Sequence, residues 1–179
     1  MDVYDEALTR TAGTPLSTKR FFPAGATVGG HALFAGGTPK DGSLVVDAYD
    51  ASLTLTAAAN LSSAQNSYAA AAVGGYALFA GDTADADVYD ASLTKTTVGI
   101  LSAARQPDAV TAGGYAFFAG GDESSMVDVC DASLTRTTLT ALSEARDSMA
   151  AAAVGDYVLF AGGRNTESLY HDTVDVYTI

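Results

Sequence analysis

One phrase, Asp-Ala-Ser-Leu-Thr, returns along the chain and constrains its fold more than any other feature of the sequence. It stands at Asp50–Thr54, Asp90–Thr94 and Asp131–Thr135, with a variant, Asp-Glu-Ala-Leu-Thr, at Asp5–Thr9. The first aspartates of consecutive copies are 45, 40 and 41 residues apart. A period of this length indicates one supersecondary unit repeated in tandem. The chain accordingly divides into a partial repeat, 1–20, and four repeats, 21–60, 61–100, 101–141 and 142–179.

Each repeat contains four segments whose patterns predict strands. The first is made of small residues, as in Ala69–Val73, and a glycine pair follows that supplies the positive φ of a tight hairpin. The second is a continuous apolar run, as in Tyr76–Ala80, which predicts a strand buried on both faces. The third, as in Val127–Cys130, alternates with period two and predicts a half-exposed strand. The fourth, as in Leu93–Thr96, is rich in threonine and suits the edge of a sheet.

Four short strands in every repeat, with small residues in the first and polar residues in the last, are typical of β-propeller blades. A solenoid fits less well because no segment shows the 3.6-residue apolar period of a helix. A two-sheet sandwich has a compatible number of strands but leaves the recurrence unexplained. We expect an all-β fold, a β-propeller of four four-stranded blades forming a single domain over residues 1–179.

The two ends of the chain encode complementary parts of one blade. Asp2–Tyr4 and Leu8–Thr11 match the third and fourth segments, whereas Met149–Val154, Tyr157–Ala161 and Val174–Tyr177 match the first three. Because unpaired strand edges favour association, we expect the N-terminal strand to complete the last blade. Closure within one chain predicts a four-bladed monomer, and the alternative, closure between two chains, predicts a homodimer with an eight-bladed ring.

The repeats resemble those of the kelch family, in which an apolar strand ends in a Gly-Gly doublet and a later strand ends in Tyr-Asp. The doublet is matched by Gly36-Gly37, Gly120-Gly121 and Gly162-Gly163, and in part by Gly81-Asp82. The tyrosine is matched by Tyr4, Tyr49, Tyr89 and Tyr177. An arginine ahead of the first strand, common in the family, is matched by Arg20, Arg105 and Arg146, with Gln65 in the remaining repeat. The resemblance implies a propeller. The chain departs from the family in having no tryptophan, with Thr56, Thr96 and Thr137 near its expected place, and in having few repeats.

The charge and cysteine content exclude several classes of partner and site. With 9 Lys and Arg against 21 Asp and Glu, the net charge is −12, which disfavours nucleic acid and anionic membrane surfaces. No run of 18 apolar residues is present, so we expect no membrane span, and the acidic start of the chain does not resemble a signal peptide. Cys130 occupies the position of the recurrent tyrosine, which indicates a packing role.

The pattern of the titratable residues favours structural roles over catalytic ones. Aspartates recur once in every repeat, and a catalytic pair is expected in a single copy. We expect each recurrent arginine to hold a strand or turn aspartate or a loop carbonyl at the junction between repeats. The expected structural residues are Arg20, Arg105, Arg146, Asp47, Asp87, Asp128 and Asp175. We expect Asp5, Asp50, Asp90 and Asp131 to cap turns. His31 replaces an aromatic residue and predicts packing, whereas His171, beside Tyr170 and Asp172, is a weak candidate for a metal or a proton shuttle. No catalytic residue, cofactor or metal is predicted.

The connection between the second and third segments varies in length among the repeats, whereas the strands do not. Such variation on one side of a repeat fold marks its binding face. The candidate binding residues on this face are Lys40, Asp41, Asp82, Asp85, Asp122, Glu123, Arg164, Asn165, Tyr170 and His171. The face is expected to have mixed charge and few exposed aromatic side chains, which argues against a carbohydrate platform.

We therefore expect a non-enzymatic binding or scaffold module that presents its variable loops to a protein partner. Two alternatives stay open. Some kelch-like propellers are glycan-active or small-ligand enzymes, which need polar groups from several blades converging in a deep pocket. The chain could also be a fragment of a longer repeat array.

Overall fold

The computed structural model describes residues 1–37, 43–65 and 68–179, and over these residues the chain is entirely β. Three repeats each form a four-stranded antiparallel sheet in chain order, and the fourth repeat forms a three-stranded one. These sheets are repeat one (β3 Ala24–Val28, β4 His31–Ala35, β5 Val46–Tyr49, β6 Leu55–Ala57), repeat two (β7 Ala69–Val73, β8 Tyr76–Ala80, β9 Asp85–Tyr89, β10 Lys95–Gly99), repeat three (β11 Asp108–Ala112, β12 Tyr115–Ala119, β13 Val127–Cys130, β14 Arg136–Thr138) and repeat four (β15 Ala150–Val154, β16 Tyr157–Ala161, β17 Val174–Thr178). Two further strands, β1 (Asp2–Tyr4) and β2 (Arg10–Ala12), form the N-terminal hairpin.

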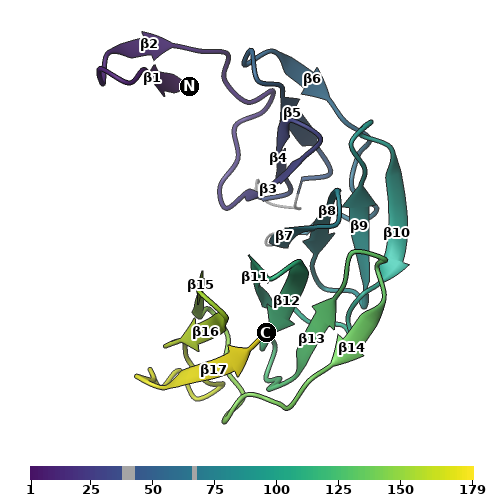
Figure 1. Ribbon diagram of the computed structural model, residues 1–179, viewed down its shortest axis with the longest axis vertical. Coiled ribbons are helices and arrows are strands. Elements are labelled where there is room, and N and C mark those ends of the chain that lie inside the picture. Colours follow the sequence, from purple (N-terminus) through teal and green to yellow (C-terminus); the bar gives the residue numbers. More distant parts are fainter. Residues whose placement is uncertain (38–42, 66–67) are drawn as a thin grey trace.

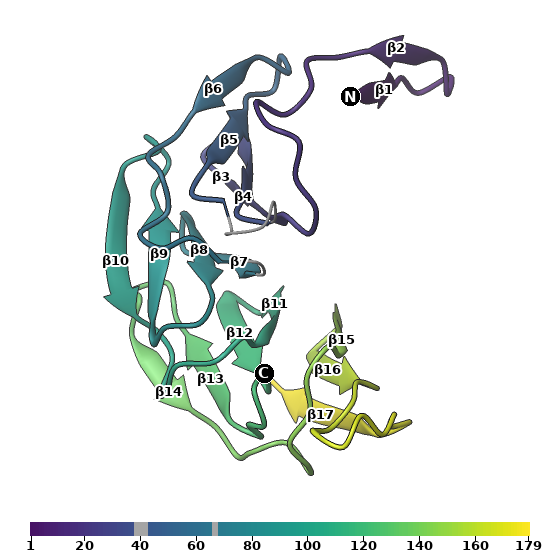
Figure 2. The ribbon, with the colours of Figure 1, turned by 180° about the vertical axis from the view of Figure 1, so that it is seen from behind.

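The sheets follow one another along an open arc (Figures 1 and 2). The first strands β3, β7, β11 and β15 line the concave side, and β6, β10 and β14 lie on the outside. Small residues on the first strands permit this close approach, because alanine and glycine leave little side chain between neighbouring backbones. Thr111 on β11 joins two of these strands directly: its hydroxyl donates to the carbonyl of Ala72 on β7 and accepts from the amide of the same residue, both at 2.9 Å.

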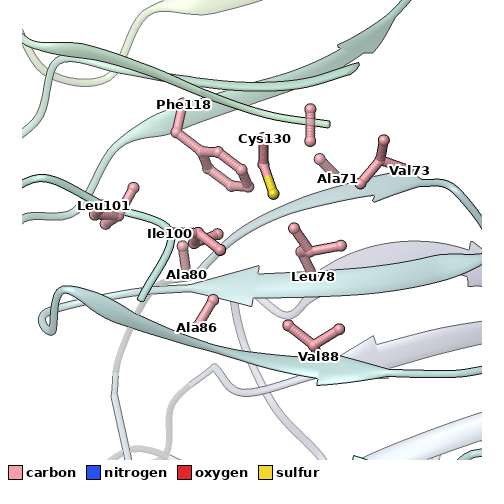
Figure 3. Packing of buried hydrophobic residues seen from close by; sticks show 11 residues of the cluster. Ala71, Val73, Leu78, Ala80, Ala86, Val88, Ile100, Leu101, Phe118 and Cys130 are labelled. Carbon is pink, nitrogen blue, oxygen red and sulfur yellow. The ribbon is translucent and has the colours of Figure 1, made fainter. Parts of the chain in front are cut away.

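An apolar cluster fills each junction between neighbouring repeats. Between repeats two and three, Leu78 and Val88 of one sheet meet Phe118 and Cys130 of the next (Figure 3), with Ile100 from the connecting segment sealing the cluster. Equivalent clusters lie between repeats one and two and between repeats three and four. Each sheet is therefore stabilised by the neighbour against which it packs.

The predicted strand positions are largely confirmed, with two corrections. The third strands of repeats one and three are not half-exposed: all of β5 and β13 is buried, because the segment that leads into each of these repeats covers the face that carries the aspartate. In repeat four, β17 alternates between exposed and half-buried residues, as predicted. The fourth strands begin two residues later than predicted, since the leucine of the repeated phrase belongs to the turn, as Leu53 does with a φ of 62°.

The prediction that the N-terminal strand completes the last sheet of its own chain is wrong. The N-terminal hairpin and repeat four lie at opposite ends of the arc (Figures 1 and 2), and β17 has only β16 as a strand neighbour within the described residues. The arc of four repeats is too open for its ends to meet. The described residues also contain no helix long and apolar enough to cross a bilayer.

Candidate functional site

The two ends of every sheet carry different kinds of connection. One end, the turn face, holds the glycine hairpins and the Asp-Ala-Ser-Leu-Thr turns. The other end, the variable-loop face, holds the connections from second to third strands and the linkers that lead into each repeat. The candidate binding residues that the structure describes belong to the variable-loop face.

A buried arginine anchors this face in three of the four repeats. The Arg105 guanidinium lies 2.8 Å from the carboxylate of Asp128 on β13 and donates to the carbonyls of Gly120 at 3.0 Å and Phe118 at 3.2 Å. Arg20 pairs in the same way with Asp47 at 2.6 Å, and Arg146 pairs with Asp175. The predicted pairing is thus confirmed for these three arginines. We call each pair, with its carbonyl contacts, an arginine clamp.

A serine completes each clamp, and our sequence analysis missed it. Ser102 donates its backbone amide and its hydroxyl to Asp128, both at 2.8 Å, and Ser143 makes the same two contacts with Asp175. The signal was present in the sequence as a Leu-Ser-X-X-Arg motif at 16–20, 101–105 and 142–146, with Gln in place of Arg at 61–65. The leucine of this motif is buried at Leu61, Leu101 and Leu142.

Hydrogen bonds keep the clamp aspartate ionised despite its burial. Burial raises the pKa of Asp128, but the hydroxyl of Thr138, the two groups of Ser102 and the Arg105 guanidinium together hold that pKa below its ordinary value. A paired and fully hydrogen-bonded carboxylate of this kind serves structure and is not available as a proton acceptor.

Repeat two shows how the fold tolerates the loss of the arginine. Gln65 is buried; it accepts the amide of Asp82 at 2.6 Å through its side-chain oxygen and donates to Ser63 at 2.8 Å. Asp87 keeps its contacts with Ser62 and takes Lys95, 3.4 Å away on β10, as its cation. The charge of each strand aspartate is therefore balanced in all four repeats.

The aspartates of the repeated phrase cap turns on the opposite face, as predicted for Asp50, Asp90 and Asp131. Asp50 Oδ1 accepts the amides of Ser52 and Thr54, each at 2.9 Å, and the Ser52 hydroxyl at 2.7 Å. These bonds, that of the Ser52 hydroxyl first, hold the pKa of Asp50 below its ordinary value. The turn places Leu53 in the left-handed region, which explains why the fourth strand begins only after it.

The longest variable loop, in repeat four, uses the same turn on the other face. Asn165 accepts the amides of Glu167 at 3.0 Å and Leu169 at 3.1 Å, and Ser168 has a φ of 58°. This compact turn projects Leu169 and Tyr170 into solvent, where Tyr170 is 88% exposed. Asn165 therefore shapes the loop, and Tyr170 forms its tip.

An ion pair and a second polar contact hold the base of this loop against the linker before repeat four. Arg164 Nε lies 3.0 Å from Asp147, and His171 Nδ1 lies 3.0 Å from Glu144. Glu144 also accepts the hydroxyl of Thr173 at 2.9 Å. His171 is thus held by one carboxylate, and within the described residues no group of three or more His, Cys, Asp or Glu side chains is arranged to hold a metal ion.

Several predicted residues meet in an open polar groove between repeats three and four. Asp122 and Glu123 lie on one side, and Asp147, Arg164 and Asn165 lie on the other. Both Asp122 and Glu123 have a positive φ, 46° and 65°. Three carboxylates against one guanidinium give the groove a net negative charge, and this suits a cationic group on a ligand.

Gln106 links this groove to the neighbouring loop of repeat two. Its side-chain amide donates to Asp82, and its backbone amide donates to Asp122 at 2.8 Å. Among the other candidates, Asp85 is exposed at the start of β9 and takes part neither in the groove nor in the contacts of Gln106. Lys40 and Asp41 lie outside the described residues. The structure thus brings together five of the candidates: Asp82, Asp122, Glu123, Arg164 and Asn165.

The expectation of few exposed aromatic side chains on this face is wrong. Phe21 and Phe22, in the linker that leads into repeat one, are 61% and 66% exposed, and their ring centroids are 3.9 Å apart. Phe22 has a φ of 55°, in the left-handed region of the backbone. Together with Tyr170 they give the variable-loop face exposed aromatic groups near both ends of the arc.

Asp108 is a half-buried carboxyl group that our sequence analysis overlooked. It begins β11 and accepts the amide of Met149 at 2.8 Å, which ties repeat three to the segment before β15. Burial raises the pKa of Asp108 to about 6, against the lowering effect of that hydrogen bond and with a contribution from the charge of Asp147. No repeated motif marks this position, since the other first strands begin with alanine.

His31 and Cys130 pack as predicted. His31 is half-buried at the start of β4, beside the glycine hairpin, and Cys130 is fully buried in the junction between repeats two and three. Burial raises the pKa of the Cys130 thiol to about 11, so this thiol is protonated at neutral pH.

Comparison with known proteins assigns no family. No protein-family model matches the chain, and no significant match is found among the curated proteins. The function proposed below therefore rests on the geometry of the variable-loop face.

Proposed function

We propose that this chain is a kelch-like propeller module without catalytic activity, and that its variable-loop face binds a protein partner. The observation that carries the proposal is the tip of the repeat-four loop, where Leu169 and Tyr170 are exposed beside the acidic groove. Interfaces concentrate their binding energy in a few exposed aromatic and apolar residues that become buried on association.

The charge of the groove specifies the chemistry of the partner. Asp122, Glu123 and Asp147 attract a lysine or arginine side chain, whereas Arg164 is already paired with Asp147. A partner surface with an apolar pocket for Tyr170 next to a basic side chain fits both features. The alternative, an enzyme, receives no comparable support: the groove is open and formed by two neighbouring repeats, and enzyme sites converge several polar groups in a concave pocket.

The contacts that hold the loops of this face favour a binding role over a catalytic mechanism that requires loop movement. The clamps of repeats three and four join the base of the loop to the third strand, through Arg105 to Gly120 and Asp128 and through Arg146 to Thr173 and Asp175. The Asn165 turn shapes the tip of the longest loop. Loops that are held in one conformation before binding lose less entropy when a partner docks.

The test is affinity capture with matched variants of the full chain. Tyr170→Ala removes the tip of the loop, and Tyr115→Ala, at an exposed tyrosine on the turn face, is the control. We expect a partner that is retained by the unsubstituted chain and the control and is lost with Tyr170→Ala. With the purified partner, Tyr170→Ala should weaken binding at least about tenfold, as for a typical interface anchor. Equal binding by all three chains would refute the proposal.

A further inference from the structure

Repeat four exposes an apolar face that its counterparts in the other repeats bury. The strand register makes Val154 equivalent to Val73 of repeat two, and Val176 equivalent to Val88. Val154 and Val176 are 65% and 54% exposed, whereas Val73 and Val88 are 4% and 1% exposed. In repeat two these positions are covered by repeat three. We call the corresponding surface of repeat four the end face.

The surface that covers such a face elsewhere is present at the other end of the arc, where the segment leading into repeat one covers only part of it: Tyr49 is 4% exposed and Phe34 is half-buried. Repeat three covers repeat two with Ala116, Phe118 and Cys130, and repeat two covers repeat one with Ala77, Phe79 and Tyr89. The equivalent residues of repeat one are Ala32, Phe34 and Tyr49, as the paired registers show. Phe34 and Tyr49 line an open groove with Pro15 and Leu16 and face no neighbouring repeat. The two ends therefore carry the two halves of a junction that the chain forms three times internally.

The segment leading into repeat one already has the geometry of an internal junction. Ser17 and Arg20 hold Asp47 in a complete clamp. The hydroxyl of Tyr49 donates to the carbonyl of Thr14 at 3.2 Å, as Tyr89 does to Ala59 and Tyr177 to Thr140. Ala12, the last residue of β2, lies 12 positions before β3, and Ala57 lies 12 positions before β7. Strand β2 is thus joined to repeat one as a fourth strand is joined to the repeat that follows it.

The pairing of β2 with β1 in the N-terminal hairpin is weakly stabilised. The hairpin contributes no residue to the apolar clusters, and each of its strands is only three residues long. A lone two-stranded hairpin is marginally stable in water. In contrast, β17 belongs to a sheet that the Arg146–Asp175 clamp secures, its free edge lacks a fourth strand, and its Val-Asp-Val-Tyr sequence contains the Asp-Val-Tyr of β1.

We propose that two copies of this chain associate head to tail, with the end face of one packed against repeat one of the other and β2 of the second copy paired with β17 of the first. In this arrangement β17 takes the place of β1 beside β2. Two such contacts close a ring of eight sheets, which is within the range of known propellers. Both contacts leave the variable-loop face exposed, so the proposed function stands or falls separately.

The first test is the mass of the full chain in solution, measured by light scattering after size exclusion. We expect twice the 18.1 kDa of one chain. Lysines in place of Val154 and Val176 should give single chains that stay folded, because both side chains are already exposed within one chain. Thr96→Lys, on the exposed outer strand of repeat two, is the matched control and should keep the double mass. A single-chain mass for the unsubstituted protein, or a double mass for the valine variant, would overturn the proposal, and a mass above that of two chains would overturn the closed ring.

The second test detects the strand exchange directly. In β1–β2 the register pairs Val3 with Thr11, and in repeat three it pairs Val129 with Thr137. The proposal therefore places Thr11 of one copy opposite Val176 of the other. The double variant Thr11→Cys, Val176→Cys should oxidise to a covalent two-chain species, visible on a denaturing gel and reversed by reductant. The double variant Val3→Cys, Thr11→Cys should cross-link poorly within one chain. Efficient cross-linking of the second pair, with none of the first, would overturn the exchange.

Discussion

The clamp of repeat three allows a quantitative test of how buried charge stabilises this fold. Arg105 is 1% exposed and Asp128 is fully buried, and the arginine also satisfies the carbonyls of Gly120 and Phe118. Arg105→Ala leaves a buried carboxylate without its closest cation. Removing one partner of such a pair costs about 3–5 kcal/mol of unfolding free energy. The nearest remaining cation, Arg136, is 4.0 Å from Asp128 and partly exposed, so it compensates only in part.

Two further variants separate the clamp from ordinary surface charge. Arg136→Ala removes an exposed contact and should cost less than about 1 kcal/mol. Arg105→Gln should fall between the two, because Gln65 shows that a glutamine fits this position in repeat two. Urea unfolding followed by far-UV circular dichroism gives the three free energies. A loss below about 1 kcal/mol for Arg105→Ala would contradict the assignment of the clamp as the main stabilising ion pair.

The pH dependence of the same variant tests the sign of the effect. The pKa of Asp128 is lowered in the folded protein, so its contribution is present above the ordinary pKa of 3.8 and is lost as the pH falls through the depressed value. Arg105→Ala removes one of the groups that lower that pKa, so the pKa of Asp128 is higher in the variant, and protonation there relieves the uncompensated charge. The stability difference between the two proteins should therefore shrink in acid. A difference that grows below pH 4 would refute this account.

Three other substitutions or modifications test separate features. Gly74→Ala and Gly75→Ala both place an alanine at positive φ, but only the first brings its Cβ within 2.5 Å of Ala132 in the next repeat. Gly74→Ala should therefore be the more destabilising of the two in thermal melts, by about 1–3 kcal/mol. Equal losses of stability would contradict the close packing. Cys130, with its pKa raised to about 11, should resist alkylation at pH 8 until urea unfolds the chain; rapid labelling of the native protein would show that the junction opens. The pKa of Asp108, raised to about 6, means that the folded state binds a proton more tightly than the unfolded state, so the ionised carboxylate destabilises the fold at higher pH. Asp108→Asn should therefore raise the unfolding free energy above pH 6, by at most about 3 kcal/mol, and have no effect near pH 3. An Asn variant that is less stable than the original at pH 8 would refute this.

The local fold could be predicted from the sequence because each repeat states the same pattern again. The second strands, such as Tyr76–Ala80, were identified to the residue from apolar runs bounded by glycine. The burial of the third strands was missed because alternation reports only which face is apolar; it does not reveal that Ser102 and Arg105 cover the polar face around Asp128.

The arrangement of the repeats could not be predicted in the same way. Closure within one chain depends on the angle between neighbouring sheets, which is set by the volume of side chains in each junction and is not written in any single repeat. The candidate site shows the same division. Asp122 and Arg164 were singled out from loop length alone, whereas Asp108 and the exposed Phe21 and Phe22 depend on backbone direction and on contacts between repeats.

The position of the clamp within the repeat governs how such a gene can grow or shrink. Each arginine lies in a linker and binds the repeat that follows it, as Arg105 binds Asp128, so a coding segment from one linker to the next specifies a buried anion together with its cation. Unequal recombination between two such segments adds or removes a whole unit without leaving any carboxylate unneutralised. The glycine hairpin that contacts the alanine of the next unit, as Gly29 contacts Ala91, is equally preserved. A change in the number of repeats can therefore arise in one genetic step, and in the resulting protein each buried aspartate keeps its cation.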